Sequence, residues 1–223
     1  MDREELLKNY RDVLENVKKY DKTGRARLLI ATKMQSVEDI NALIEDGACL
    51  IGENKVNELL EKYEGYDVRA EKHFIGTLQS NKVKYIVDKV SLIHSVDKLS
   101  LLQEIDKRAG KIGKTMDVLL EVNSGKEESK GGIFPEDVAE FYEKAKEFKN
   151  VRVRGLMTMA PKCQSREEYL KYFGLTRELF DSLFGNDENA ILSMGMSESY
   201  VYALEAGANL VRVGSKIFGE RKY

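Results

Sequence analysis

The sequence predicts an α/β fold in which eight strands close into a (β/α)8 barrel. Short apolar runs rich in β-branched residues alternate with amphipathic segments of helical period, a pattern typical of a parallel sheet. Eight such pairs fit within 223 residues, which suits one TIM-barrel domain. The first strand is followed by the turn TKMQS (32–36) rather than by the glycine fingerprint of dinucleotide-binding sheets. An open, doubly wound sheet is therefore the less favoured alternative.

The expected strands and helices alternate in order along the chain. The runs that predict strands are residues 27–32, 49–53, 73–76, 91–96, 116–123, 151–159, 190–195 and 209–214. The helical segments that follow them are residues 36–47, 55–63, 80–89, 98–110, 135–148, 166–183 and 197–206. Ser36 suits the N-cap of the first of these helices, and Pro135 suits the first turn of the helix that it opens. The charged, glycine-containing stretch 125–132 predicts a long loop.

Residues 1–22 predict an additional surface helix that packs on the barrel, because apolar side chains recur there at helical spacing among charges. This stretch lacks the apolar core of a signal peptide, and no later run approaches the about 18 apolar residues that span a bilayer. We therefore expect one domain, residues 1–223, in a soluble cytoplasmic protein without a membrane partner.

Charge and cysteine content narrow the class of ligand. The 36 basic residues are balanced by 38 acidic ones, so no basic field attracts nucleic acid. Cys49 and Cys163 are far apart and lack metal-ligand spacing, which suits a reducing compartment. We expect both to be buried apolar side chains, no metal site, and a small molecule as the ligand.

Lys33 stands immediately after the first expected strand, at the end of the barrel where the active sites of this fold lie. A lysine enclosed by a barrel mouth loses hydration, its pKa falls, and the neutral amine can form an imine with an aldehyde. The alternative is a solvated loop lysine.

The turns after the last two expected strands suit a phosphate group. In barrels, these two loops often hold phosphate. The segment SMGMS (193–197), at the end of the seventh run, contains Ser193 and Gly195, and the segment VGSKIFGE (213–220), at the end of the eighth, contains Gly214 and Ser215. Glycine allows the backbone to approach a ligand closely, and Ser215 can begin a short helix with free N–H groups.

Other polar residues lie near the expected strand ends. Arg212 interrupts the last apolar run and can donate a hydrogen bond to a ring nitrogen, although an ion pair at the rim is an alternative. Asn54 follows the second strand. His73 begins the third, where packing inside the barrel and ligand contact are both open readings. The remaining candidates are Gln79, Asn81, Lys82 and His94, the last of them a structural residue or a minor part of the pocket wall.

Several motifs in fixed order carry a family likeness. They are ATK, IGEN, HFIGTLQSNK, VNSGKEESKGG, RGLMTM, LSMGMS and VRVGSKIFGERKY. From about residue 27 to the end, the chain resembles the pyridoxal phosphate homeostasis protein family, also called the proline synthetase co-transcribed family. That family is similar to the N-terminal barrel domain of alanine racemase without the β-rich second domain. Thr32 and Lys72 stand where the family often has serine and tryptophan.

The resemblance implies a site for the vitamin B6 cofactor pyridoxal 5′-phosphate (PLP). Lys33 would form the Schiff base, and Arg212 would face the pyridine nitrogen. The phosphate would be held by Ser193, Gly195, Gly214 and Ser215, with their backbone amides. Asn54 and His73 match motif positions near the cofactor.

The resemblance also implies a function in intracellular PLP homeostasis, as a binding protein without established turnover. An unprotonated pyridine is a poor electron sink. In alanine racemase the second acid or base comes from the partner subunit's extra domain, which we do not expect in this chain. The alternatives are a PLP-dependent amino-acid racemase that uses a Tyr or Cys near the mouth, and a class I aldolase. The expected partners are PLP and apoenzymes that require it, and the expected state is a monomer.

Overall fold

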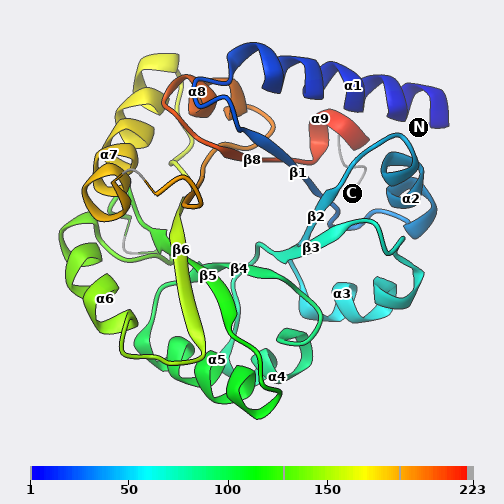
Figure 1. Cartoon of the computed structure of the whole chain (residues 1–223). Coiled ribbons are helices and arrows are strands. Elements are labelled where there is room, and N and C mark those ends of the chain that lie inside the picture. Colours follow the sequence, from blue (N-terminus) through cyan, green and yellow to red (C-terminus); the bar gives the residue numbers. More distant parts are fainter. Residues whose placement is uncertain (1, 128, 186, 220–223) are drawn as a thin grey trace.

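Eight parallel strands close into a barrel in the computed structural model, which describes residues 2–127, 129–185 and 187–219. The strands are β1 (Arg27–Ala31), β2 (Leu50–Glu53), β3 (Glu71–Phe74), β4 (Leu92–Val96), β5 (Met116–Val122), β6 (Val151–Thr158), β7 (Ile191–Ser193) and β8 (Leu210–Val213). Each strand pairs with the next, and β8 pairs with β1 to complete the ring (Figure 1). The predicted fold class is confirmed, and the open doubly wound sheet is not formed.

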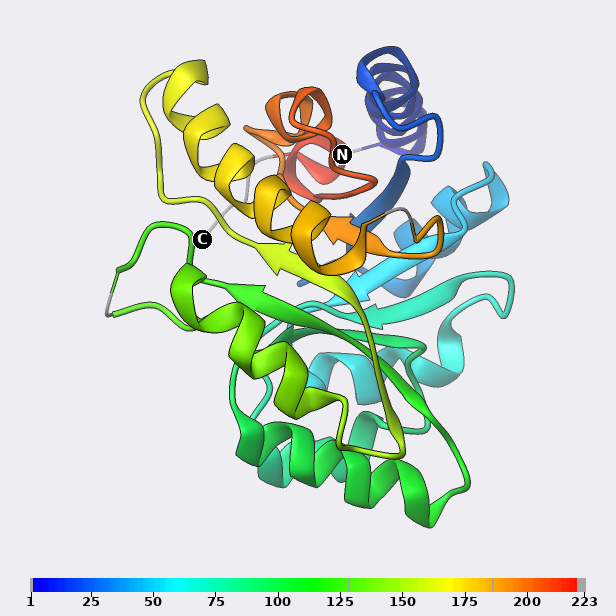
Figure 2. The ribbon, with the colours of Figure 1, turned by 60° about the vertical axis from the view of Figure 1, so that its left-hand side comes forward.

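Helices surround the barrel. They are α1 (Arg3–Tyr20), α2 (Val37–Glu45), α3 (Val56–Lys62), α4 (Val83–Ile86), α5 (Leu99–Lys111), α6 (Val138–Ala145), α7 (Arg166–Phe184), α8 (Tyr200–Glu205) and α9 (Ser215–Phe218). The 3-10 turns are η1 (Tyr63–Gly65), η2 (Ser80–Lys82) and η3 (Pro135–Asp137). Figure 2 shows α6 and α7 lying over the outer side of β5 and β6. These helices bury the outer face of the sheet and leave its inner face to the barrel core.

Local sequence signals begin several of these helices as expected. Ser36 is the N-cap of α2, and its hydroxyl accepts a hydrogen bond from the Asp39 backbone N–H at 3.1 Å. Pro135 opens the 3-10 turn that leads into α6. The helix expected over residues 80–89 is divided into η2 and the short α4. In the loop 125–132, residue 128 lies outside the described residues, as do residues 220–223 of the last family motif.

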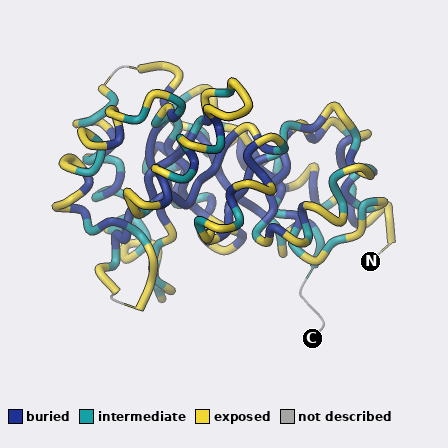
Figure 3. The backbone as a smooth tube through the Cα atoms, turned by 90° about the horizontal axis from the view of Figure 1, so that it is seen from below, coloured by how far each residue is buried: buried dark blue, intermediate teal, exposed yellow. Residues whose placement is uncertain are grey.

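Side chains along the strands alternate between two apolar regions. On β1, Leu28 and Ile30 join the large core beneath the helices, whereas Leu29 joins a small cluster with Leu50 and Leu210. A further small cluster contains Leu92, Leu119 and Met157. These small clusters fill the inside of the barrel, and Figure 3 shows buried segments, in dark blue, at the centre of the molecule.

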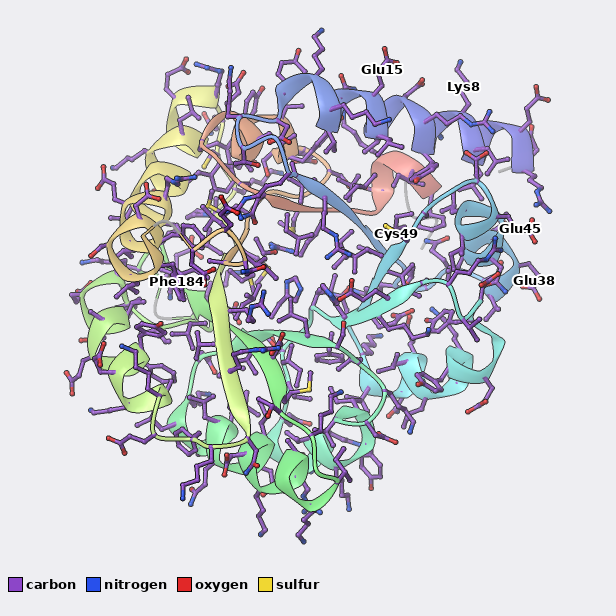
Figure 4. All side chains as sticks on the ribbon, viewed as in Figure 1. Lys8, Glu15, Glu38, Glu45, Cys49 and Phe184 are labelled. Carbon is purple, nitrogen blue, oxygen red and sulfur yellow. The ribbon has the colours of Figure 1, made fainter. Side chains whose placement is uncertain are left out.

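Helix α1 packs on the barrel through one apolar face. Its buried residues, Leu6, Tyr10, Val13 and Val17, recur every three or four positions. The helix lies against α2, α8 and α9, and Figure 4 shows Lys8 and Glu15 on its outer side. The apolar spacing thus indicates both the helix and the face that it buries.

Two expectations need correction. Strand β3 begins at Glu71 rather than residue 73, because Glu71 continues the parallel pairing opposite Leu50. Cys49 is exposed and Cys163 is partly exposed, so neither is the buried apolar residue that was expected.

Among the described residues, no helix combines the length and the apolar character needed to cross a bilayer.

Candidate functional site

A cavity of about 380 Å³ lies at the C-terminal ends of the strands. Its wall includes residues from the ends of β1, β2, β6, β7 and β8 and from the loops that follow them. The predicted site residues on this wall are Lys33, Asn54, Gly195, Arg212, Gly214 and Ser215. The topology therefore brings together residues separated by up to about 180 positions in sequence, at the mouth where this fold places its sites.

Lys33 follows β1 and is half-buried on the cavity wall. Among the described residues, its amino group has no hydrogen-bond or ion-pair partner. The backbone on either side is held in place: the Thr32 carbonyl accepts from Lys62 Nζ at 3.1 Å, and the Met34 N–H donates to Glu58 Oε2 at 2.7 Å. Met34 has a φ of 64°, a left-handed conformation that costs a non-glycine residue about 1 kcal/mol. Contacts to α3 thus hold this turn while the lysine amine remains available.

Glu53, at the end of β2, organises a buried polar cluster behind this turn. Its Oε1 accepts hydrogen bonds from Thr32 Oγ1 at 2.8 Å, Lys62 Nζ at 2.9 Å and Tyr66 OH at 2.8 Å. Its Oε2 is buried without a partner among the described residues. Burial, together with the Glu53 charge, raises the pKa of Tyr66. Sequence reasoning missed this role of Glu53, although a carboxylate that ends an apolar strand was a usable signal.

Arg212 of β8 is buried and borders the cavity. Its NH1 donates to Ser193 Oγ at 2.6 Å, and its NH2 donates to the Thr158 carbonyl at 3.1 Å. Burial lowers the pKa of Arg212 to about 10, opposed by the charge of Glu121. The guanidinium is therefore a cation at neutral pH. It is held by a hydroxyl and a carbonyl rather than by an ion pair at the rim.

Glu121 of β5 is a second buried acidic group that sequence reasoning missed. It is 6% exposed, and strand alternation places it on the same side of β5 as Leu119 of the inner cluster. Burial raises the pKa of Glu121 to about 7, with a further increase from Asp97 and an opposing effect from Arg212. An acidic residue within the apolar run MDVLLEVN was the available signal.

The turns after β7 and β8 form a backbone-lined side of the cavity. Gly195 has a φ of 84°, and a Cβ there would lie 2.6 Å from Ala203 Cβ. A Cβ on Gly214 would lie 3.0 Å from the Ala31 carbonyl oxygen. Ser197, not anticipated from the sequence, accepts from the Gly214 N–H at 3.2 Å through its hydroxyl. Small residues and backbone N–H groups therefore meet where a phosphate was expected.

The side chains of Ser193 and His73 lie inside the barrel. The Ser193 hydroxyl is fully buried and is used by Arg212 and by His94 Nδ1, which lies 3.2 Å away. His73 is buried inside the barrel, with Nδ1 at 2.9 Å from His94 Nε2. Neither residue is part of the cavity wall, because their inward-facing positions lie deeper in the barrel. Of the two readings for His73, the structure favours packing, and His94 is likewise interior.

The chain matches known proteins over nearly its full length. The family model described as alanine racemase, N-terminal domain, matches residues 1–222. A protein of Aquifex aeolicus named pyridoxal phosphate homeostasis protein is 47% identical over 219 residues, which is 95% of this chain and 96% of the relative. One of the same name in Helicobacter pylori is 37% identical and covers 90% of each chain.

Solved structures are also similar to this chain over nearly its full length. The structure of PipY from Synechococcus elongatus with PLP bound has a TM-score of 0.83 and 27% identity, covering 96% of this chain and 100% of that one. An alanine racemase from Clostridium difficile has a TM-score of 0.75 and 19% identity, and the match covers 97% of this chain and 58% of the racemase. The second likeness concerns the fold alone.

Proposed function

Since this chain belongs to the pyridoxal phosphate homeostasis protein family, we propose that it binds PLP at the barrel mouth and serves in intracellular PLP homeostasis. The observation that carries the proposal is the amino group of Lys33. It has no polar partner among the described residues and lies on the wall of a cavity that also contains the Arg212 guanidinium and the Gly214 turn. These groups match an aldehyde, a ring nitrogen and a phosphate, which are three of the polar groups of PLP.

Lys33 is the proposed attachment point. Its amine would hold the PLP aldehyde through a C=N bond, whose formation releases water. The flanking contacts of Thr32 and Met34 support this role, because they hold the turn without occupying the amine. The lysine therefore needs little backbone rearrangement to bind the cofactor.

Arg212 is the proposed partner of the pyridine nitrogen. Its guanidinium only donates hydrogen bonds, and its pKa of about 10 keeps it protonated at neutral pH. A donor that keeps its proton leaves the ring nitrogen unprotonated. Bound PLP would then supply only weak electron withdrawal, which favours a carrier over a transaminase or decarboxylase.

The glycine turns are the proposed phosphate side. The absence of a side chain at Gly195 and Gly214 allows a phosphate to approach the backbone, and Ser215 begins α9 next to it. Asn54, on the same cavity wall, would contact the cofactor from the β2 side. Ser193 and His73 would act on the cofactor only through Arg212.

The test is to incubate the purified protein with PLP, reduce it with borohydride and locate the modified residue by peptide mass spectrometry. The proposal expects one phosphopyridoxyl group, on Lys33. Lys162, which also borders the cavity, is the matched control, because Lys162→Ala should label normally and Lys33→Ala should not. A colourless wild-type protein, or a label spread over surface lysines, would overturn the proposal.

A PLP-dependent racemase is the second candidate, and Tyr169 is the observation that favours it. Tyr169 borders the cavity and stacks against Phe173 at 5.9 Å and Tyr202 at 5.8 Å between ring centroids. Its phenol would be the second acid or base. Steady-state turnover of an amino acid that is lost in both Lys33→Ala and Tyr169→Phe would favour the racemase over the carrier. The names of the relatives give the aldolase alternative no support.

We further propose a cytoplasmic monomer that passes PLP to apoenzymes. Size-exclusion chromatography with light scattering tests the monomer. Transfer is tested by mixing the PLP-loaded protein with a PLP-dependent apoenzyme and comparing the rate of reactivation with that given by free PLP.

A further inference from the structure

A chain of hydrogen bonds crosses the inside of the barrel beneath the cavity. It runs from Arg212 on β8 to Ser193 on β7, to His94 on β4, to His73 on β3, and ends at Glu71 near the start of β3. The successive distances are 2.6 Å, 3.2 Å, 2.9 Å and 3.0 Å. Strands β4 and β7 are not neighbours in the barrel, so the contact between His94 and Ser193 spans its interior.

The direction of every hydrogen bond in this chain follows from its two ends. Glu71 as a carboxylate only accepts, so His73 donates to it from Nε2. A neutral His73 then accepts at Nδ1 from Nε2–H of His94. Neutral His94 accepts at Nδ1 from the Ser193 hydroxyl, whose oxygen accepts from Arg212. All donors therefore point from the guanidinium towards the carboxylate.

The charges around the two rings favour this neutral arrangement. Burial lowers the pKa of His94 well below its usual value, and His73 and Arg212 lower it further. Burial also lowers the pKa of His73. Glu71 and Asp117 oppose that shift, and Arg27 adds to it. At the far end, the hydrogen bond from His73 lowers the pKa of Glu71. Arg27 NH2 donates to Glu71 Oε2 at 2.6 Å and holds the carboxylate in place.

We propose that His94 and His73 are positioning residues that, through Ser193, hold Arg212 in the orientation that meets the cofactor's pyridine nitrogen. The inference rests on the proposed function, because the cofactor is the group that Arg212 would meet. The Ser193 oxygen accepts the hydrogen bond from Arg212 in a fixed orientation only while the Ser193 hydroxyl hydrogen is bonded to His94. The histidines therefore restrict the rotation of the hydroxyl and, through it, of the guanidinium.

The first test needs no cofactor. The sequence has two histidines in all, so the untagged protein labelled with ¹⁵N-histidine gives signals from His73 and His94 alone. Between pH 6 and 8 both rings should carry a proton on Nε2 and none on Nδ1. A ring with Nδ1–H, or a cationic ring at pH 7, would overturn the inference whatever the variants do.

The second test interrupts the hydrogen-bond chain next to Arg212. Ser193→Ala should shift the His94 Nδ1 signal and raise the dissociation constant for PLP about tenfold, the effect of one misplaced charge-assisted hydrogen bond. His94→Leu should have a similar effect on PLP. His94→Asn, whose side-chain oxygen can still accept from Ser193, should recover much of the affinity. Ser95→Ala is the matched control, because Ser95 is a buried serine whose hydroxyl donates to the Gly76 carbonyl, and it should change neither readout.

The outcomes separate this inference from the proposed function. If the wild-type protein takes up PLP on Lys33 and Ser193→Ala holds it as tightly, the inference alone fails. If the wild-type protein does not bind PLP, the proposed function fails. The proposed role of the hydrogen-bond chain in positioning Arg212 for the cofactor then fails with it. Equal weakening by Ser193→Ala and Ser95→Ala would also overturn the inference, because it would indicate a general loss of packing.

Discussion

Replacing Glu53 by glutamine should destabilise the protein through the cluster behind the Lys33 turn. Glu53 is 1% exposed and its ion-pair partner Lys62 is 14% exposed in the side chain, with 2.9 Å between Nζ and Oε1. A charge-assisted hydrogen bond contributes about 1.5–3 kcal/mol and a neutral one about 0.5–1.5 kcal/mol. Glutamine has nearly the same shape as glutamate but no charge. The hydrogen bond to Lys62 therefore loses the difference between these two free energies, and the bonds to Thr32 and Tyr66 lose part of it. The expected loss in unfolding free energy is about 2 kcal/mol.

Urea denaturation followed by circular dichroism measures this loss, and a double-mutant cycle assigns it. The single variants Glu53→Gln and Lys62→Met should each be destabilised, and the double variant should be less destabilised than their sum by about 1 kcal/mol or more. Glu58 also contacts Lys62, at 3.4 Å, and keeps part of the lysine's stabilisation. A Glu53→Gln protein within about 0.5 kcal/mol of wild type, or strict additivity, would refute the reasoning that this cluster is energetically coupled.

Three further perturbations have defined outcomes. Gly195→Ala should cost about 2 kcal/mol or more in urea unfolding and weaken PLP binding, because the new Cβ would lie 2.6 Å from Ala203 Cβ at a φ of 84°; wild-type stability would contradict this. The folded pKa of Glu121 is raised from 4.5 to about 7, so its stabilising effect is present below pH 4.5 and is lost as pH rises through 7. The unfolding free energy of Glu121→Gln should therefore equal that of wild type near pH 4 and exceed it by up to about 3 kcal/mol at pH 8. If the two proteins differ in unfolding free energy by the same amount at both pH values, the assignment of the raised pKa to Glu121 is wrong. PLP at about 100 times its dissociation constant should stabilise the wild-type protein by about 2.7 kcal/mol in thermal unfolding, and a Lys33→Ala protein with the same gain would argue against covalent attachment.

Much of the fold could be predicted from local signals. The eight apolar runs indicated the strands to within a few residues, because every strand except β3 has buried β-branched or aliphatic side chains. The start of β3 was misplaced because Glu71 and Lys72 are polar, and their strand conformation depends on pairing with β2. A sequence pattern cannot report a partner strand that is distant along the chain.

Part of the site could also be predicted from the sequence. The rule that barrel sites lie at strand ends placed Lys33, Arg212 and Gly214 on the cavity wall, where the structure has them. Ser193 shares a motif with Gly195, but Ser193 is the last residue of β7 and its hydroxyl contacts Arg212 and His94 inside the barrel, whereas Gly195 lies in the turn beyond the strand. The contact between His94 and Ser193 could not be anticipated, because β4 and β7 are not neighbours and meet only across the interior of the closed barrel.

The pairing of β1 with β8 has a consequence for biosynthesis. Leu29 lies opposite Arg212 in this pairing, so the cavity is built from the first strand and the last strand to leave the ribosome. A nascent chain that presents Lys33 has no completed pocket until Arg212 of β8 and the turn after it have also been made. Contacts this distant in sequence also form slowly. Cofactor binding at the proposed site therefore requires that β8 has been made and has paired with β1.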